Sequence, residues 1–233
     1  GRTDSGTATV QRMSTDASLR TVIMPPPSDI TPADRCVVLL HGYGANAHDL
    51  LPLRDDIAPA WTAIAIEAPI DLSPMGMPNG RAWFHITPSA DGTLSLDVAG
   101  AESAVRQLMA QIPQAVESAG FSLENTVIMG FSQGAMLGHA LLLREHLTMR
   151  GLASCSGRMM REFVGDGSRV CADQPVFLSH GTHDELIPVS SGHELRDLYQ
   201  LHTPACVTWC EEPIGHGIGP NMIESMRAWF AAV

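Results

Sequence analysis

The sequence predicts an α/β fold, with a mostly parallel central sheet flanked by helices on both faces. Short apolar runs alternate with helix-like segments along most of the chain, an order typical of parallel βαβ units. Several runs, such as 36–40, are apolar at every position, which indicates strands buried on both faces. The 233 residues are enough for one domain with a sizeable core. We place that domain at 18–233, after a polar flexible arm at 1–17.

Each expected strand is a short apolar run bounded by polar or turn-forming residues. These runs lie at 19–24, 36–40, 62–66, 126–129, 151–155, 176–178 and 206–209. Three prolines at 25–27 end the first run, because proline has no N–H to offer a neighbouring strand. Residues 70–96 contain Pro, Gly and Met without a clear period. We therefore expect a long loop there, over the functional face.

The expected helices lie between these runs, at 98–119, 133–146, 190–199 and 222–232. In the first of them, Val105, Leu108, Ile112 and Val116 recur at helical spacing. Gly120 supplies its stop. Because helices connect strands of the same direction, the carboxyl ends of the strands meet at one edge of the sheet, where functional residues gather.

A G-x-S-x-G pentapeptide, Gly130 to Gly134, lies between a strand-like run and a helix-like segment. In that setting the motif is a nucleophile elbow, a sharp turn that exposes a serine hydroxyl at the top of an α/β-hydrolase sheet. Glycines flank the serine because the turn leaves almost no room for side chains. Ser132 is therefore the candidate nucleophile, and it needs a base to take its proton during attack.

Two further polar motifs follow strand-like runs downstream of the elbow and contain Asp184 and His216. The order serine, aspartate, histidine is that of α/β-hydrolases and differs from the orders of chymotrypsin and subtilisin. We predict a triad in which His216 is the base and Asp184 orients its imidazole. Gly215 and Gly217 are expected to let the histidine loop approach the elbow.

Two alternatives compete for the aspartate motif. Glu185 stands next to Asp184 and is a rival carboxylate for the triad. His180, His183 and Asp184 together resemble part of a metal site, but no further histidine-rich ligand set accompanies them. We therefore expect no metal and no other cofactor.

Five phrases along the chain resemble the phospholipase/carboxylesterase family, which includes the acyl-protein thioesterases. They are LHGYGAN (40–46), GRAWF (80–84), GFSQGA (130–135), SHGTHDELIPV (179–189) and GHGI (215–218). The resemblance implies that Asp184, rather than Glu185, is the acid of the triad. One position departs from the family's usual pattern, because His85 stands where an aspartate commonly follows the Trp-Phe pair.

An oxyanion hole needs two backbone N–H groups that point at the developing negative oxygen. The residue after the nucleophile, Gln133, is expected to provide one, and the loop after strand 36–40 the other. The resemblance implies that Tyr43 is the residue of that loop. Large apolar residues of the loop 70–96 are candidates for the acyl-binding site, because such pockets are lined mostly by apolar groups. They are Met75, Met77, Trp83 and Phe84; ordinary packing of the loop is the alternative.

Composition excludes several classes of function. The formal net charge is −11, which disfavours nucleic acid and anionic membranes as partners. All 14 basic residues are arginine, so lysine nucleophiles and Schiff bases are excluded. No apolar stretch approaches the ~20 residues needed to span a bilayer, and the polar residues 1–17 do not read as a signal peptide. We expect a cytoplasmic protein.

The five cysteines do not have the spacing of a metal site or of a full disulfide framework. One pair that includes Cys206 or Cys210 stays open. Together these observations predict a serine carboxylic-ester hydrolase that cleaves small short-to-medium acyl esters through an acyl-enzyme. The alternatives are an acyl-protein thioesterase or lysophospholipase, and a non-catalytic binding protein on the same scaffold. The resemblance also allows a homodimer.

Overall fold

The computed structural model describes residues 18–90, 94–165, 173–202 and 207–233, so the expected arm at 1–17 lies outside the described residues. Its centre is a seven-stranded sheet in the order β1-β3-β2-β8-β9-β10-β11. The strands are β1 (Thr21–Met24), β2 (Cys36–Leu40), β3 (Thr62–Ile66), β8 (Thr126–Phe131), β9 (Gly151–Cys155), β10 (Val176–Gly181) and β11 (Val207–Glu212). Only β1 is antiparallel to its neighbour within this sheet.

Strand β2 shows why the apolar runs have no polar alternation. All five of its residues are buried, and it pairs in parallel with β3 on one side and β8 on the other. Val38 and Leu40 belong to the core on one face of the sheet, whereas Val37 and Leu39 belong to the core on the opposite face. Successive side chains of a strand point to opposite faces, so a strand covered on both faces must be apolar throughout.

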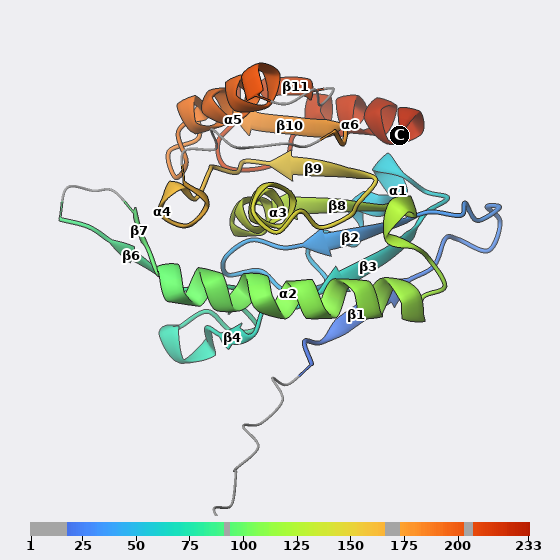
Figure 1. The fold of residues 1–233 in the computed structure, drawn as a ribbon, viewed down its shortest axis with the longest axis horizontal. Helices are drawn as coiled ribbons and strands as arrows, with labels where there is room; N and C mark the ends of the chain where they lie inside the picture. Colours follow the sequence, from blue (N-terminus) through green and yellow to red (C-terminus); the bar gives the residue numbers. More distant parts are fainter. Residues whose placement is uncertain (1–17, 91–93, 166–172, 203–206) are drawn as a thin grey trace, which may run out of the picture.

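Helices cover both faces of the sheet. They are α1 (Leu53–Ile57), α2 (Val98–Ser118), α3 (Gln133–Leu143), α4 (Arg161–Val164), α5 (Val189–His202) and α6 (Pro220–Ala232). Buried residues of α2, α3 and α5 share one core, and those of α1 and α6 share the other. Figure 1 shows α2 crossing in front of the sheet, with α3 above it in this view and close to β8. The predicted α/β fold, a mostly parallel sheet with helices on both faces, is therefore confirmed.

The expected loop 70–96 contains regular structure that its sequence did not indicate. Strands β4 (Ile70–Asp71) and β5 (Arg81–Ala82) pair around a 3₁₀ turn, Ser73–Met75, and β6 (Ile86–Pro88) pairs with β7 (Leu94–Leu96). Strands of two or three residues are too short to show a period, so the expectation of a plain loop was wrong. The β6–β7 ribbon projects from the body at the edge toward which β9 and β10 run (Figure 1).

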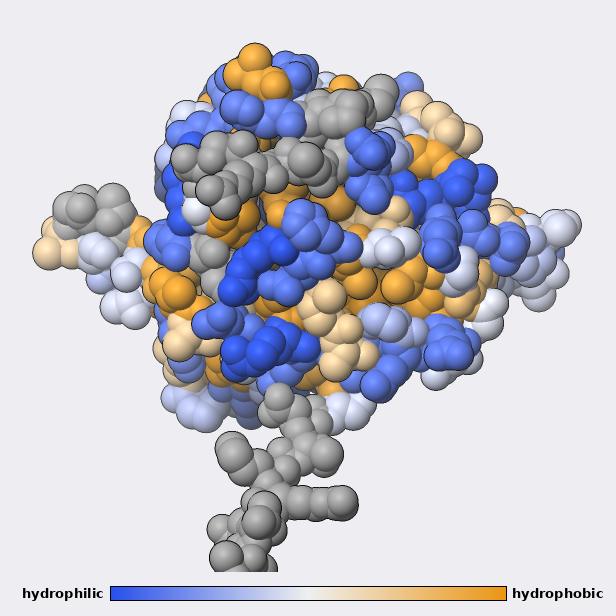
Figure 2. All heavy atoms as spheres, viewed as in Figure 1, coloured by the Kyte–Doolittle hydropathy of each residue, from blue (hydrophilic) through white to orange (hydrophobic). Residues whose placement is uncertain are grey.

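The same limit explains the short elements α1, α4 and the 3₁₀ turn Leu123–Asn125, which the sequence did not predict. The predicted start of the last strand at Cys206 lies outside the described residues. On the face seen in Figure 2, hydrophilic and hydrophobic residues are interspersed. Within the described ranges, no helix is both long and apolar enough to cross a membrane.

Candidate active site

Ser132 occupies the turn between β8 and α3 in a strained backbone conformation. Its φ is 54° and its ψ is −113°, a region that residues other than glycine rarely adopt and that is found at functional sites. The glycines around it are required by space. A Cβ at Gly134 would lie 2.0 Å from the carbonyl oxygen of Leu40, and one at Gly130 would lie 2.4 Å from the backbone of Gly134. The elbow is thus held tightly against β2.

Ser132, His216 and Asp184 form one hydrogen-bonded line. His216 Nε2 lies 2.8 Å from Ser132 Oγ, and His216 Nδ1 lies 2.6 Å from Asp184 Oδ2. The other carboxylate oxygen of Asp184 accepts the backbone N–H groups of Leu186 and Ile187, both at 2.9 Å. The Asp184 carboxylate is fully buried, so these bonds hold it in one orientation toward the imidazole.

The neighbouring carboxylate has a different environment. Glu185 is exposed and lines the outer cavity described below rather than contacting His216 in the described structure. His180 lies beside the same oxygen that meets His216: its Nε2–H donates to the Ile187 carbonyl at 2.8 Å and lies 3.5 Å from Asp184 Oδ2. Burial lowers the pKa of His180, which keeps it neutral. Asp184 is therefore the carboxylate that meets His216.

The histidine loop approaches the sheet through a glycine other than the expected ones. A Cβ at Gly215 would have ordinary van der Waals room, and one at Gly217 would meet open space. A Cβ at Gly181, at the end of β10, would lie 2.2 Å from the Gly215 carbonyl oxygen and 2.4 Å from that of Ile214. The expectation for Gly215 and Gly217 was wrong, since the close approach depends on Gly181.

Tyr43 and Gln133 lie on two sides of the serine. Tyr43 lines the cavity that contains Ser132. A Cβ on its neighbour Gly42 would lie 3.3 Å from Ser132 Cβ, so this loop passes directly beside the nucleophile. Gln133 is the first residue of α3, where backbone N–H groups have no partner within the helix. Among the described residues, neither backbone N–H has a hydrogen-bond partner, as a binding site for an oxyanion requires.

The four apolar residues expected in the acyl site lie elsewhere. Trp83 and Phe84 are buried in the core, at 1% and 0% exposed. Trp83 Nε1–H donates to the His41 carbonyl at 2.9 Å, and the Gln133 side-chain amide bonds to Trp83 N and Phe84 O, both at 2.8 Å. These two residues therefore brace the two loops beside Ser132. They do not line the cavity.

Met75 and Met77 also lie outside the cavity that contains Ser132. Both are exposed, at 58% and 40%, and they belong to the turn between β4 and β5. Met77 Sδ would lie 3.5 Å from a Cβ placed on Gly44, so the turn packs beside the oxyanion loop, which we define as residues 41–45. The alternative of ordinary loop packing describes them better than the predicted acyl-binding role.

An apolar cavity of about 290 Å³ opens at the serine, and a second of about 310 Å³ adjoins it. Five residues line both, namely Ile86, Leu94, Met136, Leu186 and Ile187. These residues come from the β6–β7 ribbon, from α3 and from the loop that follows β10 and contains Asp184. None of these five residues was among the predicted site residues, although Met136 and Leu186 stand within a few positions of the elbow and of Asp184. Their closeness to the motifs is the one feature of the sequence that could have indicated a place in the cavity.

No group of three or more His, Cys, Asp or Glu side chains in the described ranges could hold a metal ion. His180 and His183 do not form such a group with Asp184. The donor set beside Ser132 therefore consists of a hydroxyl, an imidazole, a carboxylate and backbone N–H groups. This set can perform nucleophilic acyl transfer with general base assistance.

The fold and the arrangement around the elbow define the α/β-hydrolase class. Residues 26–233 match the model of the phospholipase/carboxylesterase family. The chain belongs to this family, and it is a serine ester hydrolase.

Individual relatives agree with this assignment. Acyl-protein thioesterase 1 of Kluyveromyces lactis is 28% identical over 187 residues, which cover 75% of this chain and 80% of the relative. The putative hydrolase MhqD of Bacillus subtilis is 27% identical over 199 residues, covering 85% and 93%. Among solved structures, esterase PE8 is similar with a TM-score of 0.78 and 29% identity, covering 93% of this chain and 99% of that one.

Proposed function

We propose that this protein cleaves short-to-medium acyl esters by attack of Ser132, with His216 as base, Asp184 as orienting acid and Tyr43 and Gln133 as oxyanion donors. The observation that carries the proposal is the Ser132–His216–Asp184 line of hydrogen bonds at 2.8 and 2.6 Å. The strained elbow beside two unpaired backbone N–H groups supports it, because strain and unpaired donors persist where the chemistry uses them.

The reaction follows from these positions. Ser132 Oγ attacks the acyl carbon while its proton passes to His216 Nε2, and the carbonyl oxygen becomes an oxyanion facing the two N–H groups. His216 then gives the proton to the departing alkoxide, which leaves an acyl-enzyme and a free alcohol. In the second half of the reaction, water attacks the acyl-enzyme with His216 as base, and the carboxylic acid is released. The charge on Asp184 stabilises the imidazolium in both halves.

Activity assays of Ser132→Ala test the roles at the site. The variant should fold like the wild type and lose esterase activity by several orders of magnitude, because triad members act as a unit. A serine-directed phosphonate should label the wild type once, at Ser132, and leave the variant unlabelled. Full activity in the variant, or a label on another residue, would show that the nucleophile lies elsewhere.

Activity in the presence of a chelator should equal the untreated rate, because the proposed chemistry uses only side chains and backbone N–H groups.

The size of the cavity supports the substrate class. At about 290 Å³, the space at the serine stands near the lower end of the ~300–1,000 Å³ range of ligand pockets. Each methylene that fits should add about 0.8 kcal/mol of burial. We expect kcat/KM to rise to an acyl chain of roughly four to eight carbons and to fall beyond it.

Leu186→Ser tests whether the cavity binds the acyl chain. Leu186 lines both apolar cavities and is 62% exposed, so the change should cost little stability. It should lower kcat/KM for octanoyl esters by about tenfold and leave acetyl esters nearly unchanged. Leu201→Ser is the matched control, because Leu201 is 77% exposed near the end of α5. Equal effects on both acyl lengths would contradict the acyl-site assignment.

The enzyme alternative is a thioesterase or lysophospholipase. Ester and thioester pass through the same oxyanion, so the site accommodates both. Initial rates over an acyl-length series, with esters against thioesters, separate them. An optimum at palmitoyl thioesters would favour the thioesterase.

We also propose that the protein works in the cytoplasm. Support comes from Cys36, Cys155 and Cys210, which are free thiols in the described structure, as is usual in reducing compartments. Cys171 and Cys206 lie outside the described residues, so a pairing of Cys206 stays open. A homodimer, which the family resemblance allows, also stays open; the molar mass from light scattering tests it.

A further inference from the structure

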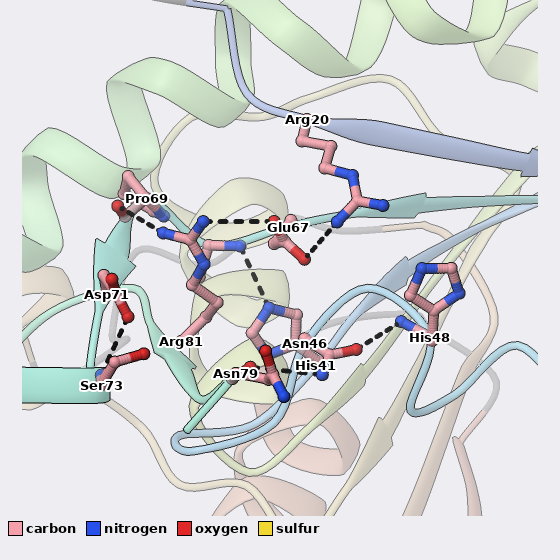
Figure 3. A network of polar contacts seen from close by, with 11 residues as sticks. Arg20, His41, Asn46, His48, Glu67, Pro69, Asp71, Ser73, Asn79 and Arg81 are labelled. Carbon is pink, nitrogen blue, oxygen red and sulfur yellow. Dashed lines mark hydrogen bonds and ion pairs between the residues drawn. The ribbon is translucent and has the colours of Figure 1, made fainter. Parts of the chain in front are cut away.

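A polar network lies beside the oxyanion loop, and none of its residues lines the apolar cavity at Ser132. Figure 3 shows Glu67 between the guanidinium groups of Arg20 and Arg81, with Asn46 and His48 nearby. Glu67 Oε1 lies 3.4 Å from Arg20 NH1, and its Oε2 lies 3.5 Å from Arg81 NH2. The network lines a polar cavity of about 280 Å³. Arg81 and Asn46 stand in two of the phrases that resemble the family, but the proposed chemistry assigns the network no role.

The backbone of Arg81 holds the oxyanion loop at the two residues that follow Tyr43. The N–H of Gly44 donates to the Arg81 carbonyl at 2.8 Å, and the N–H of Arg81 donates to the Ala45 carbonyl at 2.8 Å. The two segments approach so closely that a Cβ on Gly80 would lie 2.9 Å from the Gly44 carbonyl oxygen. A displacement of Arg81 therefore moves the peptide units next to the Tyr43 N–H.

The side chain of Arg81 ties this bridge to the end of β3. Besides its ion pair with Glu67, it donates to the Pro69 carbonyl at 3.4 Å. The Glu67 side chain is only 7% exposed, whereas that of Arg20 is 61% exposed. A carboxylate this buried requires partners. The partner on the loop side is Arg81, because Arg20 reaches Glu67 from the solvent side.

The residue after Glu67 reaches the oxyanion loop directly. The Ala68 N–H donates to His41 Nε2 at 3.0 Å, so His41 carries its proton on Nδ1, which donates to the Gly42 carbonyl at 2.8 Å. Burial lowers the pKa of His41, which favours this neutral form. Segments 67–69 and 80–83 thus both hydrogen-bond to the oxyanion loop. The Glu67–Arg81 ion pair links these two segments.

We propose that the Glu67–Arg81 ion pair is a positioning device for the oxyanion hole, which keeps the Tyr43 N–H aimed at the developing oxyanion. The inference rests on the proposed function, since it assumes that Tyr43 supplies a donor. Neither side chain lines the cavity at Ser132. Their effect belongs to the transition state, because the loop position matters most when the carbonyl oxygen gains charge.

The test compares Glu67→Gln and Arg81→Gln with the wild type on p-nitrophenyl butyrate. Rates are expressed per active site titrated by the phosphonate, so misfolded molecules do not count. Each variant should lower kcat by about tenfold, less than the ~100-fold of losing a donor outright, with KM nearly unchanged. The affinity for an alkylboronic acid, whose tetrahedral adduct places an oxygen in the oxyanion hole, should fall in parallel. The double variant should lose little more than either single one.

Two controls separate positioning from stability. Arg20→Gln removes the partner on the solvent side and leaves the link to the loop, and Glu102→Gln removes an exposed ion pair with Arg144. Both should keep kcat within about twofold of wild type. If Glu67→Gln does not fold, Arg81→Gln carries the test, since that side chain is 33% exposed. Unchanged kcat and boronate affinity in a folded, phosphonate-labelled variant would overturn the inference and leave the Ser132 assignment intact.

Discussion

Asp184 and Glu185 are adjacent carboxylates, yet a shift of one position along the chain gives them different environments and different roles. Asp184 is fully buried, accepts two backbone N–H groups and meets His216 at 2.6 Å, whereas Glu185 is exposed. The loop after β10 turns one side chain inward and the next outward. A buried carboxylate held by fixed donors can stabilise an imidazolium, and a solvated one at the surface cannot do so with the same strength.

Replacement of each acid by its amide should therefore give sharply different enzymes. Asp184→Asn removes the charge opposite His216 and can select the wrong tautomer, so kcat should fall by about 10⁴-fold. Glu185→Gln should be nearly silent. Steady-state kinetics at pH 7 on the same ester measures both. A larger loss in Glu185→Gln would mean that the wrong acid was chosen.

At the scale of elements, the segment after β5 is joined to the start of α3. The Gln133 side chain at the start of α3 binds the backbone of Trp83 and Phe84, and the Trp83 indole binds the His41 carbonyl. Two turns that are far apart in the sequence, the elbow and the oxyanion loop, are thus held in one unit. This bracing gives Trp83 a purpose other than substrate contact.

Trp83→Phe tests the bracing, because it removes the indole N–H and keeps an aromatic ring. The His41 carbonyl would lose its partner in a buried place, a loss of about 1–3 kcal/mol. We expect lower kcat at every acyl length and no shift of the optimum. Trp61→Phe is the matched control, since Trp61 is also buried, in the core on the other face of the sheet. A shift of the optimum toward longer chains would instead place Trp83 at the acyl site.

At the scale of the whole molecule, three elements, α3, β9 and α5, meet in a buried polar contact. His139 of α3 lies 2.8 Å from Ser154 Oγ of β9 and 2.8 Å from Tyr199 OH of α5. Complete burial lowers the pKa of His139 from 6.5 to about 3. The folded protein therefore keeps this imidazole neutral under conditions in which an unfolded chain would protonate it.

The sign of the resulting pH dependence follows from linkage. Below pH 6.5 the unfolded chain binds a proton that the folded protein does not bind until about pH 3. Stability should fall over this window by up to about 1.4 kcal/mol per pH unit from this group. His139→Gln should be less stable at pH 7, and its stability should depend on pH with a slope smaller by one proton. Urea unfolding between pH 7 and 4 measures both slopes, and identical slopes would contradict the assignment.

The sequence by itself determined the features whose signals are local. Continuous apolar runs located the buried strands, because a strand covered on both faces must be apolar at every position. The residues Ser132, Asp184 and His216, which the structure brings together, each stand in a short motif after a strand of the central sheet. The acid was separated from Glu185 only by the family resemblance, since both side chains look alike in sequence.

Only the tertiary structure decided which side chains face one another. An apolar residue such as Trp83 can line a substrate pocket or pack beneath a loop, and the sequence does not distinguish these two places. Its contacts with His41 and Gln133 in the structure do. The need for a glycine at Gly181 depends on a backbone more than thirty positions away, at Gly215. The link from Glu67 to the oxyanion loop likewise depends on contacts between distant segments. Periodicity and motifs report neighbours along the chain, whereas contacts across the fold follow from how the elements pack.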